Sequence, residues 1–234
     1  LLAGCSSPNP NGISAEGESM SSGPESASGA LKDISETQTE KLTQSSESLF
    51  SSKDLDTSWD TSDSVSVVFS DGEAKIAGTN GSAVFRDGTL TISKAGTYIL
   101  SGSLKGSVIV EASKNDFVHL VLNGIEITCE NSAPINIRQA DKAVITLADS
   151  TENKLTDSTE YQYDDPDAEE PSAVLFSKDD LSLNGNGSLT IQANHNNGIQ
   201  SKDDLRISGG SYFITAAKNG IVGKDYLVIS NGSF

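Results

Sequence analysis

A repeat of 22 to 24 residues in the second half of the chain limits its fold more than any other feature. Three segments align without gaps: residues 173–181 (AVLFSKDDL), 197–205 (NGIQSKDDL) and 219–227 (NGIVGKDYL). Short β-rich runs separated by Gly, Asn and Asp surround them, and no long helical period interrupts these runs. A fixed period of this length is typical of repeat proteins in which each copy is one structural unit.

Apolar positions recur with the same period, which indicates strands stacked copy upon copy. The positions in register are Leu181, Leu205 and Leu227, and then Leu183, Ile207 and Ile229. We therefore expect an all-β fold, a right-handed single-stranded parallel β-helix with these side chains inside. A leucine-rich repeat lacks support because its consensus is absent, and a β-sandwich is not expected to keep register over successive copies.

Charge divides the chain into regions. The chain has 234 residues and a net charge of −17, but residues 1–62 hold ten acidic residues against three lysines, and residues 148–172 hold nine against one. Residues 6–62 are rich in Ser, Glu and Thr, which predicts a disordered linker. The β-helix domain is expected over residues 63–234, which are close to neutral outside the 148–172 segment, and to continue beyond Phe234 because no terminal cap is present.

The first five residues, Leu-Leu-Ala-Gly-Cys, resemble a bacterial lipobox. We expect this remnant of a signal peptide to place a lipid on Cys5, so that an exported protein is anchored to the membrane or cell surface. No apolar run reaches the ~18 residues of a membrane helix. The acidic balance argues against nucleic-acid binding, which needs a basic surface, and we expect a monomer.

The repeated Lys-Asp-Asp corner carries the main candidate site. Equivalent carboxylates on neighbouring strands lie about 4.8 Å apart and repel one another. Ca²⁺ takes oxygen ligands at 2.3–2.6 Å and fits between such a pair. The predicted calcium ligands are Asp179, Asp180, Asp203 and Asp204, with Asn197, Asn219 and Asp225 as further candidates. The alternative is a solvated corner without metal, in which each Asp accepts local backbone hydrogen bonds.

The lysines of the repeat are a second candidate group. Lys178, Lys202 and Lys224 occupy one column, where they either offset the aspartate repulsion or bind a ligand. The acidic loop over residues 161–171 interrupts the repeat before the first corner. It either lines a binding face or is a solvated acidic run. Cys129 is expected to be an inert buried thiol.

Several tracts resemble a bacterial family of exported, carbohydrate-binding, pectate-lyase-like β-helix proteins. They are VHLVLNGIEIT (118–128), INIRQADKAVITLAD (135–149), LFSKDDLSLNGNGSLTI (175–191) and NGIQSKDDLRISGG (197–210). The resemblance implies bound Ca²⁺ at Asp179, Asp180, Asp203 and Asp204, and affinity for cellulose or acidic polymers such as polygalacturonate. Tyr226 replaces an Asp in the third copy, which weakens the case for a site near Asp225.

Three functions follow from these observations. The first is a cell-surface lipoprotein that binds polysaccharide with the help of calcium and performs no chemistry. The second is a calcium-dependent polysaccharide lyase, with Lys202 as the base that removes a proton from a uronate. The third is a structural stalk or adhesin.

Overall fold

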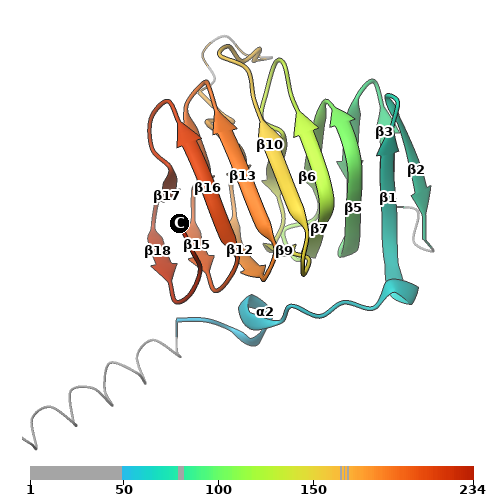
Figure 1. Ribbon diagram of the computed structural model, residues 1–234, viewed down its shortest axis with the longest axis horizontal. Coiled ribbons are helices and arrows are strands. Elements are labelled where there is room, and N and C mark those ends of the chain that lie inside the picture. Colours follow the sequence, from blue (N-terminus) through green and yellow to red (C-terminus); the bar gives the residue numbers. More distant parts are fainter. Residues whose placement is uncertain (1–48, 79–81, 164, 166, 168) are drawn as a thin grey trace, which may run out of the picture. The chain divides into compact units, whose positions relative to one another are not determined.

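The chain forms two β-sheets (Figure 1). The computed structural model describes residues 49–78, 82–163, 165, 167 and 169–234. In the 11-stranded sheet the main order is β16-β13-β10-β7-β9-β12-β15-β18, with β5, β1 and β2 attached in turn beside β7. In the 7-stranded sheet the order is β17-β14-β11-β8-β6-β4-β3. The prediction of an all-β fold is confirmed.

Most strands are short, as the spacing of the Gly, Asn and Asp corners predicts. The 11-stranded sheet contains β1 (Ser64–Ser70), β2 (Glu73–Ala77), β5 (Gly96–Lys105), β7 (Phe117–Thr128), β9 (Lys142–Leu147), β10 (Glu152–Thr156), β12 (Asp180–Gly185), β13 (Ser188–Ala193), β15 (Asp204–Ile207), β16 (Ser211–Ala216) and β18 (Tyr226–Ile229). The 7-stranded sheet contains β3 (Ala83–Arg86), β4 (Thr89–Ile92), β6 (Ser107–Glu111), β8 (Ile135–Gln139), β11 (Ala173–Ser177), β14 (Asn197–Ser201) and β17 (Ile221–Gly223).

The predicted right-handed single-stranded parallel β-helix is wrong. The strands belong to two mixed sheets, neither of them closed, and two pairs, β1–β2 and β3–β4, are antiparallel. Asp-Gly corners at residues 71–72 and 87–88, all at positive φ, make the tight turns of these two pairs. The 12-residue strand β7 pairs with β9 near its start and with β10 near its end, which joins both sets of strands into one sheet. A repeat period specifies which strands pair, but not how many sheets result.

The strand register predicted from the repeat is confirmed, although its burial is confirmed only in part. The paired positions are Leu181, Leu205 and Leu227 in one row and Leu183, Ile207 and Ile229 in the next. The four residues of the first two copies are fully buried, whereas Leu227 and Ile229 are 43% and 45% exposed. The predicted interior stacking is therefore wrong for the third copy, which lies at the edge of the sheet.

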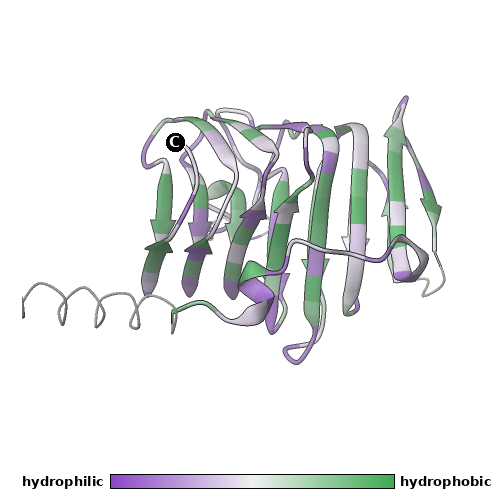
Figure 2. Ribbon diagram, turned by 60° about the horizontal axis from the view of Figure 1, so that its bottom comes forward, coloured by the Kyte–Doolittle hydropathy of each residue, from purple (hydrophilic) through white to green (hydrophobic). Residues whose placement is uncertain are grey.

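Among the described residues, one large apolar cluster runs through both sheets and forms the core. Strand β13 shows how the sequence produces it: Leu189, Ile191 and Ala193 alternate with more exposed residues, because successive side chains of a strand point to opposite faces. Figure 2 shows strands with this alternation of apolar and polar residues. The outward positions are therefore free to carry polar side chains, and the candidate sites lie among them.

Residues 49–63, here called the strap, run along the 11-stranded sheet to the start of β1 (Figures 1 and 2). The strap contains α2 (Ser52–Leu55) and the short 3-10 helix η1 (Thr61–Asp63). The side chain of Asp54 is 1% exposed and pairs with Lys142 of β9 at 2.7 Å. The part of the predicted linker from 49 to 62 is thus attached to the sheet, which differs from the prediction.

The remaining predictions for the start of the chain fall on residues 1–48. The lipidated Cys5 and the rest of the predicted linker lie outside the described residues. Within the described part of the chain, no helix has both the length and the apolar character that crossing a membrane requires.

Candidate functional site

The lysine column of the repeat lies where strands of the 7-stranded sheet end. Lys178, Lys202 and Lys224 directly follow β11, β14 and β17, and the amides of Lys202 and Lys224 donate to carbonyl oxygens of the preceding copy. Glu170 bridges the first two, with Nζ–Oε distances of 3.4 Å to Lys178 and 2.6 Å to Lys202. Lys224 is exposed. Two lysines of the column therefore share one carboxylate.

That carboxylate belongs to the connection between β10 and β11, residues 157–172, which contains the acidic loop predicted over residues 161–171 and is called the acidic loop from here on. At the start of the loop Asp157, which is 4% exposed, accepts hydrogen bonds from the amide of Asn194 (2.5 Å) and the hydroxyl of Tyr161 (2.8 Å). The Tyr161 ring stacks on His195 with centroids 4.2 Å apart. Burial and the charge of Asp157 raise the pKa of Tyr161 well above its usual value. Tyr161 therefore stays protonated and donates within the loop to Asp157, and its hydroxyl also lies 3.4 Å from the carbonyl oxygen of Ala173 at the start of β11.

The far end of the loop is held by side chains as well. The hydroxyl of Tyr163 lies 3.1 Å from the carbonyl oxygen of Pro171 and 3.3 Å from Nε2 of His195. Ser172 donates to Oε1 of Gln200 on β14 at 2.9 Å. These contacts place Glu170 beside the lysine column. That the loop lines a binding face, or is a solvated acidic run, stays a prediction.

Tyr163 and Glu170 form a wall between two hollows, because both residues line each of them. The His195 hollow has a volume of about 500 Å³, and the Arg138 hollow has about 410 Å³. The first is lined, besides the wall, by Glu169, Ser172, His195, Asn196, Asn197, Gln200, Lys202, Lys218 and Asn219. The second is lined by Glu111, Ser132, Asn136, Arg138, Gln139, Gln162, Asp165, Pro171, Phe176 and Lys178.

Each hollow contains a buried side-chain oxygen that no described residue bonds: Oδ1 of Asn136 in the Arg138 hollow and Oδ1 of Asn196 in the His195 hollow. Asn136 is 4% exposed and occupies the outward row of the sheet beside Phe176. Leaving a buried polar group without a partner costs about 1–3 kcal/mol, and such groups are rare in native proteins. The described residues therefore leave one polar group without a hydrogen bond in each hollow.

The predicted asparagine ligands lie in the His195 hollow, away from the aspartates. Oδ1 of Asn197 accepts from both the amide and the side chain of Asn219 at 3.1 Å, and its Nδ2 donates to Gln200 at 2.8 Å. These amides form a ladder along the repeat. The structure therefore does not bring Asn197 and Asn219 together with the predicted calcium ligands.

Three of the four predicted aspartates do converge. One carboxylate oxygen from each of Asp180, Asp203 and Asp204 lies within 4.8 Å of the other two. Asp179 is separate, since its carboxylate accepts from the amide of Ala140 at 3.0 Å. Asp225 is exposed, and its amide bonds the Asp203 carbonyl at 3.4 Å.

The repulsion within this cluster is offset by cations that the sequence analysis did not select. Arg206 lies 2.7 Å from Asp204 and 3.5 Å from Asp180, and Lys142 lies 4.0 Å from Asp180. Burial raises the pKa of Asp180 above its ordinary value, while the charges of Lys142 and Arg206 oppose that rise. Both cations were accessible to sequence reasoning: Arg206 follows Asp204 by two residues on the same strand face, and Lys142 is in register with Asp180.

A profile of the family described as "Carbohydrate-binding domain-containing protein" matches residues 86–234. The chain belongs to this family. A relative of the same name from Acetivibrio thermocellus is 39% identical over 151 residues, which cover 64% of this chain and 52% of the relative. The chain thus spans about half the length of that relative.

A solved structure gives a second comparison. It is the "polysaccharide lyase-like protein from C. thermocellum", a gadolinium derivative, with a TM-score of 0.66 and 33% identity, covering 72% of this chain and 80% of that one. The residues that match the family include the lysine column, both hollows and the Asp180, Asp203 and Asp204 cluster, whereas the strap precedes them.

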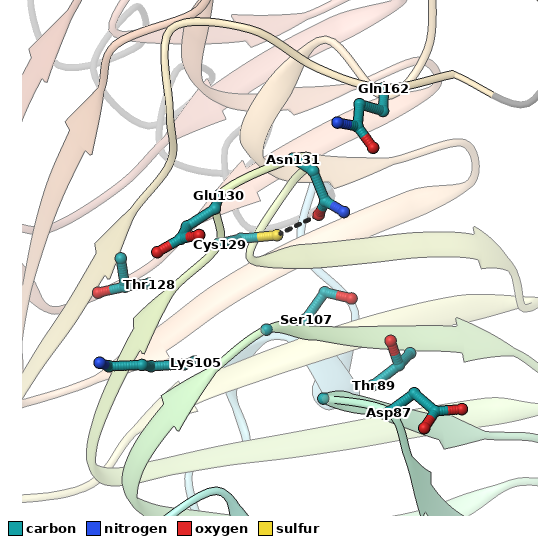
Figure 3. A pocket seen from close by; sticks show the side chains of 11 residues that line it. Asp87, Thr89, Lys105, Ser107, Thr128, Cys129, Glu130, Asn131 and Gln162 are labelled. Carbon is teal, nitrogen blue, oxygen red and sulfur yellow. Dashed lines mark hydrogen bonds between the residues drawn. The ribbon is translucent and has the colours of Figure 1, made fainter.

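A further hollow lies within the family region, where Gln162 of the loop lines it together with residues 87–89, 105–107 and 128–131 (Figure 3). It has a volume of about 480 Å³, and polar side chains such as Lys105 and Glu130 line it together with Cys129. The thiol of Cys129 is 3.6 Å from Oδ1 of Asn131, and burial raises its pKa. Cys129 is therefore a poor nucleophile, in keeping with the inert thiol that the sequence predicts.

Sequence reasoning missed most residues of the two main hollows. It identified the loop and the lysines, but not Glu170, Tyr163, His195 or Asn136. The sequence did contain a signal for Asn136. Residues 135–137 (INI) of β8 pair with residues 175–177 (LFS) of β11, and this register places Asn136 opposite Phe176 in an outward position. No signal of repeat or spacing could have located Glu170, because loop residues have no register.

Proposed function

We propose that the protein binds polysaccharide, without chemistry of its own, along the two hollows that flank Tyr163 and Glu170. The observation that carries the proposal is the buried side-chain oxygen of Asn136, a residue that lines the Arg138 hollow, which no described residue bonds. The matching Asn196 oxygen lies across the wall in the second hollow. Sugar hydroxyl groups are donors of the kind that both oxygens lack. The family name of this chain and of its relative supports the same ligand class.

The shape of the site favours a polymer over a single sugar. Two adjacent hollows of about 500 and 410 Å³ that share a wall offer room for successive units of one chain. Amide side chains such as Gln200, Asn197 and Asn219 supply both donors and acceptors to hydroxyl groups. The ligand is cellulose or an acidic sugar polymer, since Arg138, Lys178, Lys202 and Lys218 provide charge alongside neutral amides.

A pull-down with a panel of insoluble and soluble polysaccharides tests the proposal. Asn136→Ala removes the buried acceptor and is expected to lower affinity for the retained polymer about two- to tenfold, since a lost hydrogen bond is worth about 0.5–1.5 kcal/mol. The matched control is Asn186→Ala, because Asn186 is an exposed asparagine outside both hollows. Failure of the complete protein to retain any polysaccharide would reject binding. Equal retention by both variants would reject this site.

We also propose that Ca²⁺ binds at Asp180, Asp203 and Asp204. Three converging carboxylates are the hard oxygen donors that this ion prefers. The fit is partial, since Arg206 already bonds two of these carboxylates and supplies positive charge there. Asp203 makes no ion pair within 4.0 Å among the described residues, so it is the carboxylate most available to a cation.

Calcium that binds only the folded state raises the free energy of unfolding by about 2.7 kcal/mol when the free calcium concentration is a hundred times its Kd. We therefore predict that a chelator lowers the melting temperature of the wild-type protein, and that Asp203→Asn largely abolishes this effect. Asp179→Asn is the control, because Asp179 lies outside the cluster. Identical melting curves in calcium and in chelator would leave Arg206 and Lys142 as the only groups that offset the repulsion.

The lyase alternative is a weaker fit. Lys202, the residue named as its base, is bonded to Glu170 and has no ion pair with the Asp180, Asp203 and Asp204 cluster among the described residues. The proposed base is therefore paired with a carboxylate that is not part of the proposed metal cluster. Absorbance of an unsaturated uronate, developing when the protein is mixed with pectate, would revive this alternative.

Attachment outside the cytoplasmic membrane is a further part of the proposal. The lipobox-like start of the chain supports a lipid on Cys5 and an exported, membrane-anchored protein. Metabolic labelling with a fatty acid tests it in bacteria that express the protein behind a complete lipoprotein leader. The label is expected on the wild-type protein and absent from Cys5→Ser, and equal labelling of the two proteins would reject the lipid anchor.

A further inference from the structure

We propose that Glu170 is an internal competitor for the carboxylate groups of an acidic polysaccharide, and so sets how strongly Lys178 and Lys202 hold such a polymer. The inference rests on the proposed function, because it assigns a specificity-determining residue to the same pair of hollows.

The contact itself is that of a bound carboxylate. One oxygen of Glu170 lies 2.6 Å from Nζ of Lys202, and the other lies 3.4 Å from Nζ of Lys178. The side chain of Glu170 is 29% exposed, that of Lys202 is 32% exposed and that of Lys178 is 51% exposed. Ion pairs with this much solvent access are weak, so a carboxylate from solution can replace the internal one.

Two lysines on adjacent strands require an anion near them. Equivalent positions of neighbouring strands are about 4.8 Å apart, and like charges at that distance repel. Glu170 provides the anion. Burial by itself would raise the pKa of Glu170, but the hydrogen bond and charge of Lys202 and the charge of Lys178 have the larger combined effect, so the pKa is lowered. The side chain is thus ionised at neutral pH and carries the same group as a uronate.

The position of Glu170 makes the competition selective. Glu170 and Tyr163 line both hollows, so a polymer that passes from one hollow to the other meets this carboxylate midway. An acidic polymer can exchange one of its own carboxylates for that of Glu170 on the two lysines. A neutral polymer has no group to exchange and leaves the ion pairs intact.

Calorimetric titration of the complete protein with oligogalacturonate and with a cello-oligosaccharide tests the inference. Glu170→Gln keeps the size of the side chain and removes its charge. We expect this variant to bind oligogalacturonate about three- to tenfold more tightly than wild type, with unchanged affinity for the neutral oligomer. Glu160→Gln is the matched control, because Glu160 is exposed in the same loop, lines neither hollow and makes no ion pair within 4.0 Å among the described residues.

Each outcome decides a separate point. Wild type that binds acidic oligomers as tightly as Glu170→Gln, or more tightly, overturns the competitor role while the proposed function stands. An equal gain in Glu160→Gln also overturns it, since the general acidity of the loop would then be the cause. If neither protein binds any oligomer, both the competitor role and the proposed function fail. Circular dichroism and the melting temperature of each variant verify the fold, and Glu170→Ala repeats the test if Glu170→Gln is unstable.

Discussion

At the scale of single residues, Asp54 shows how a side chain in a region of low sequence complexity becomes fixed. Its carboxylate accepts from Lys142 at 2.7 Å, from Ser182 at 2.5 Å and from the amide of Ser51 at 2.6 Å. Burial alone raises the pKa of Asp54, but these hydrogen bonds outweigh it and lower the pKa from 3.8 to about 2. The folded state therefore holds the ionised form more strongly than the unfolded chain does.

This difference predicts a pH dependence of stability. The contribution of Asp54 is fully present above the unfolded pKa near 3.8 and is lost as the pH falls toward 2, and its size is about 2 kcal/mol. Asp54→Asn removes it and leaves the Lys142 ammonium, only 13% exposed, without its nearest carboxylate. We expect a loss of about 3 kcal/mol at pH 7 and a flatter stability profile between pH 4 and 2.

Urea unfolding of wild type and Asp54→Asn across this pH range measures the effect. Asp63→Asn serves as the control, since Asp63 lies in the same strap with an exposed side chain, and it is expected to change stability by less than about 0.5 kcal/mol. Parallel stability curves for wild type and Asp54→Asn would show that the buried pair contributes nothing.

At the scale of elements, the repeat predicts pairing well and architecture poorly. The in-register apolar residues of β12, β15 and β18 lie on neighbouring strands because parallel pairing follows the repeat directly. The number of sheets depends instead on β7, whose length lets it pair with both β9 and β10. The hairpin turns at residues 71–72 and 87–88 were accessible as Asp-Gly pairs, the strongest short-range hairpin signal.

The strap was beyond sequence reasoning for a physical reason. It lacks apolar periodicity, and polar contacts hold it: Asn184 of β12 donates to the carbonyl oxygens of Asp54 and Asp56 at 3.1 and 2.9 Å, and Arg206 of β15 donates to that of Leu49 at 2.8 Å. Only Trp59 packs against a small apolar group on the sheet. Composition predicts whether a segment forms its own core, not whether it fits polar positions on another surface.

At the scale of the whole molecule, different groups lie on the outer faces of the two sheets. The outer side of the 11-stranded sheet around β9, β12 and β15 is engaged by the strap, through Lys142, Asn184 and Arg206. The outer side of the 7-stranded sheet carries the acidic loop, the lysine column and the two hollows. From the sequence, the lysine column was placed in one corner with the aspartates of the repeat. In the structure the lysines follow strands of the 7-stranded sheet, whereas Asp180 and Asp204 begin strands of the 11-stranded sheet.

The central claim is that polysaccharide binds in the two hollows beside Glu170, and amide chemical-shift mapping tests it most directly. The isotope-labelled protein is titrated with a soluble oligomer of whichever polysaccharide it retains. We predict saturable shifts that centre on the side-chain amides of Asn136, Asn196 and Gln200 and on the backbone of Tyr163 and Glu170. Shifts confined to the strap or to the Asp180, Asp203 and Asp204 corner, with these amides unmoved, would contradict the account.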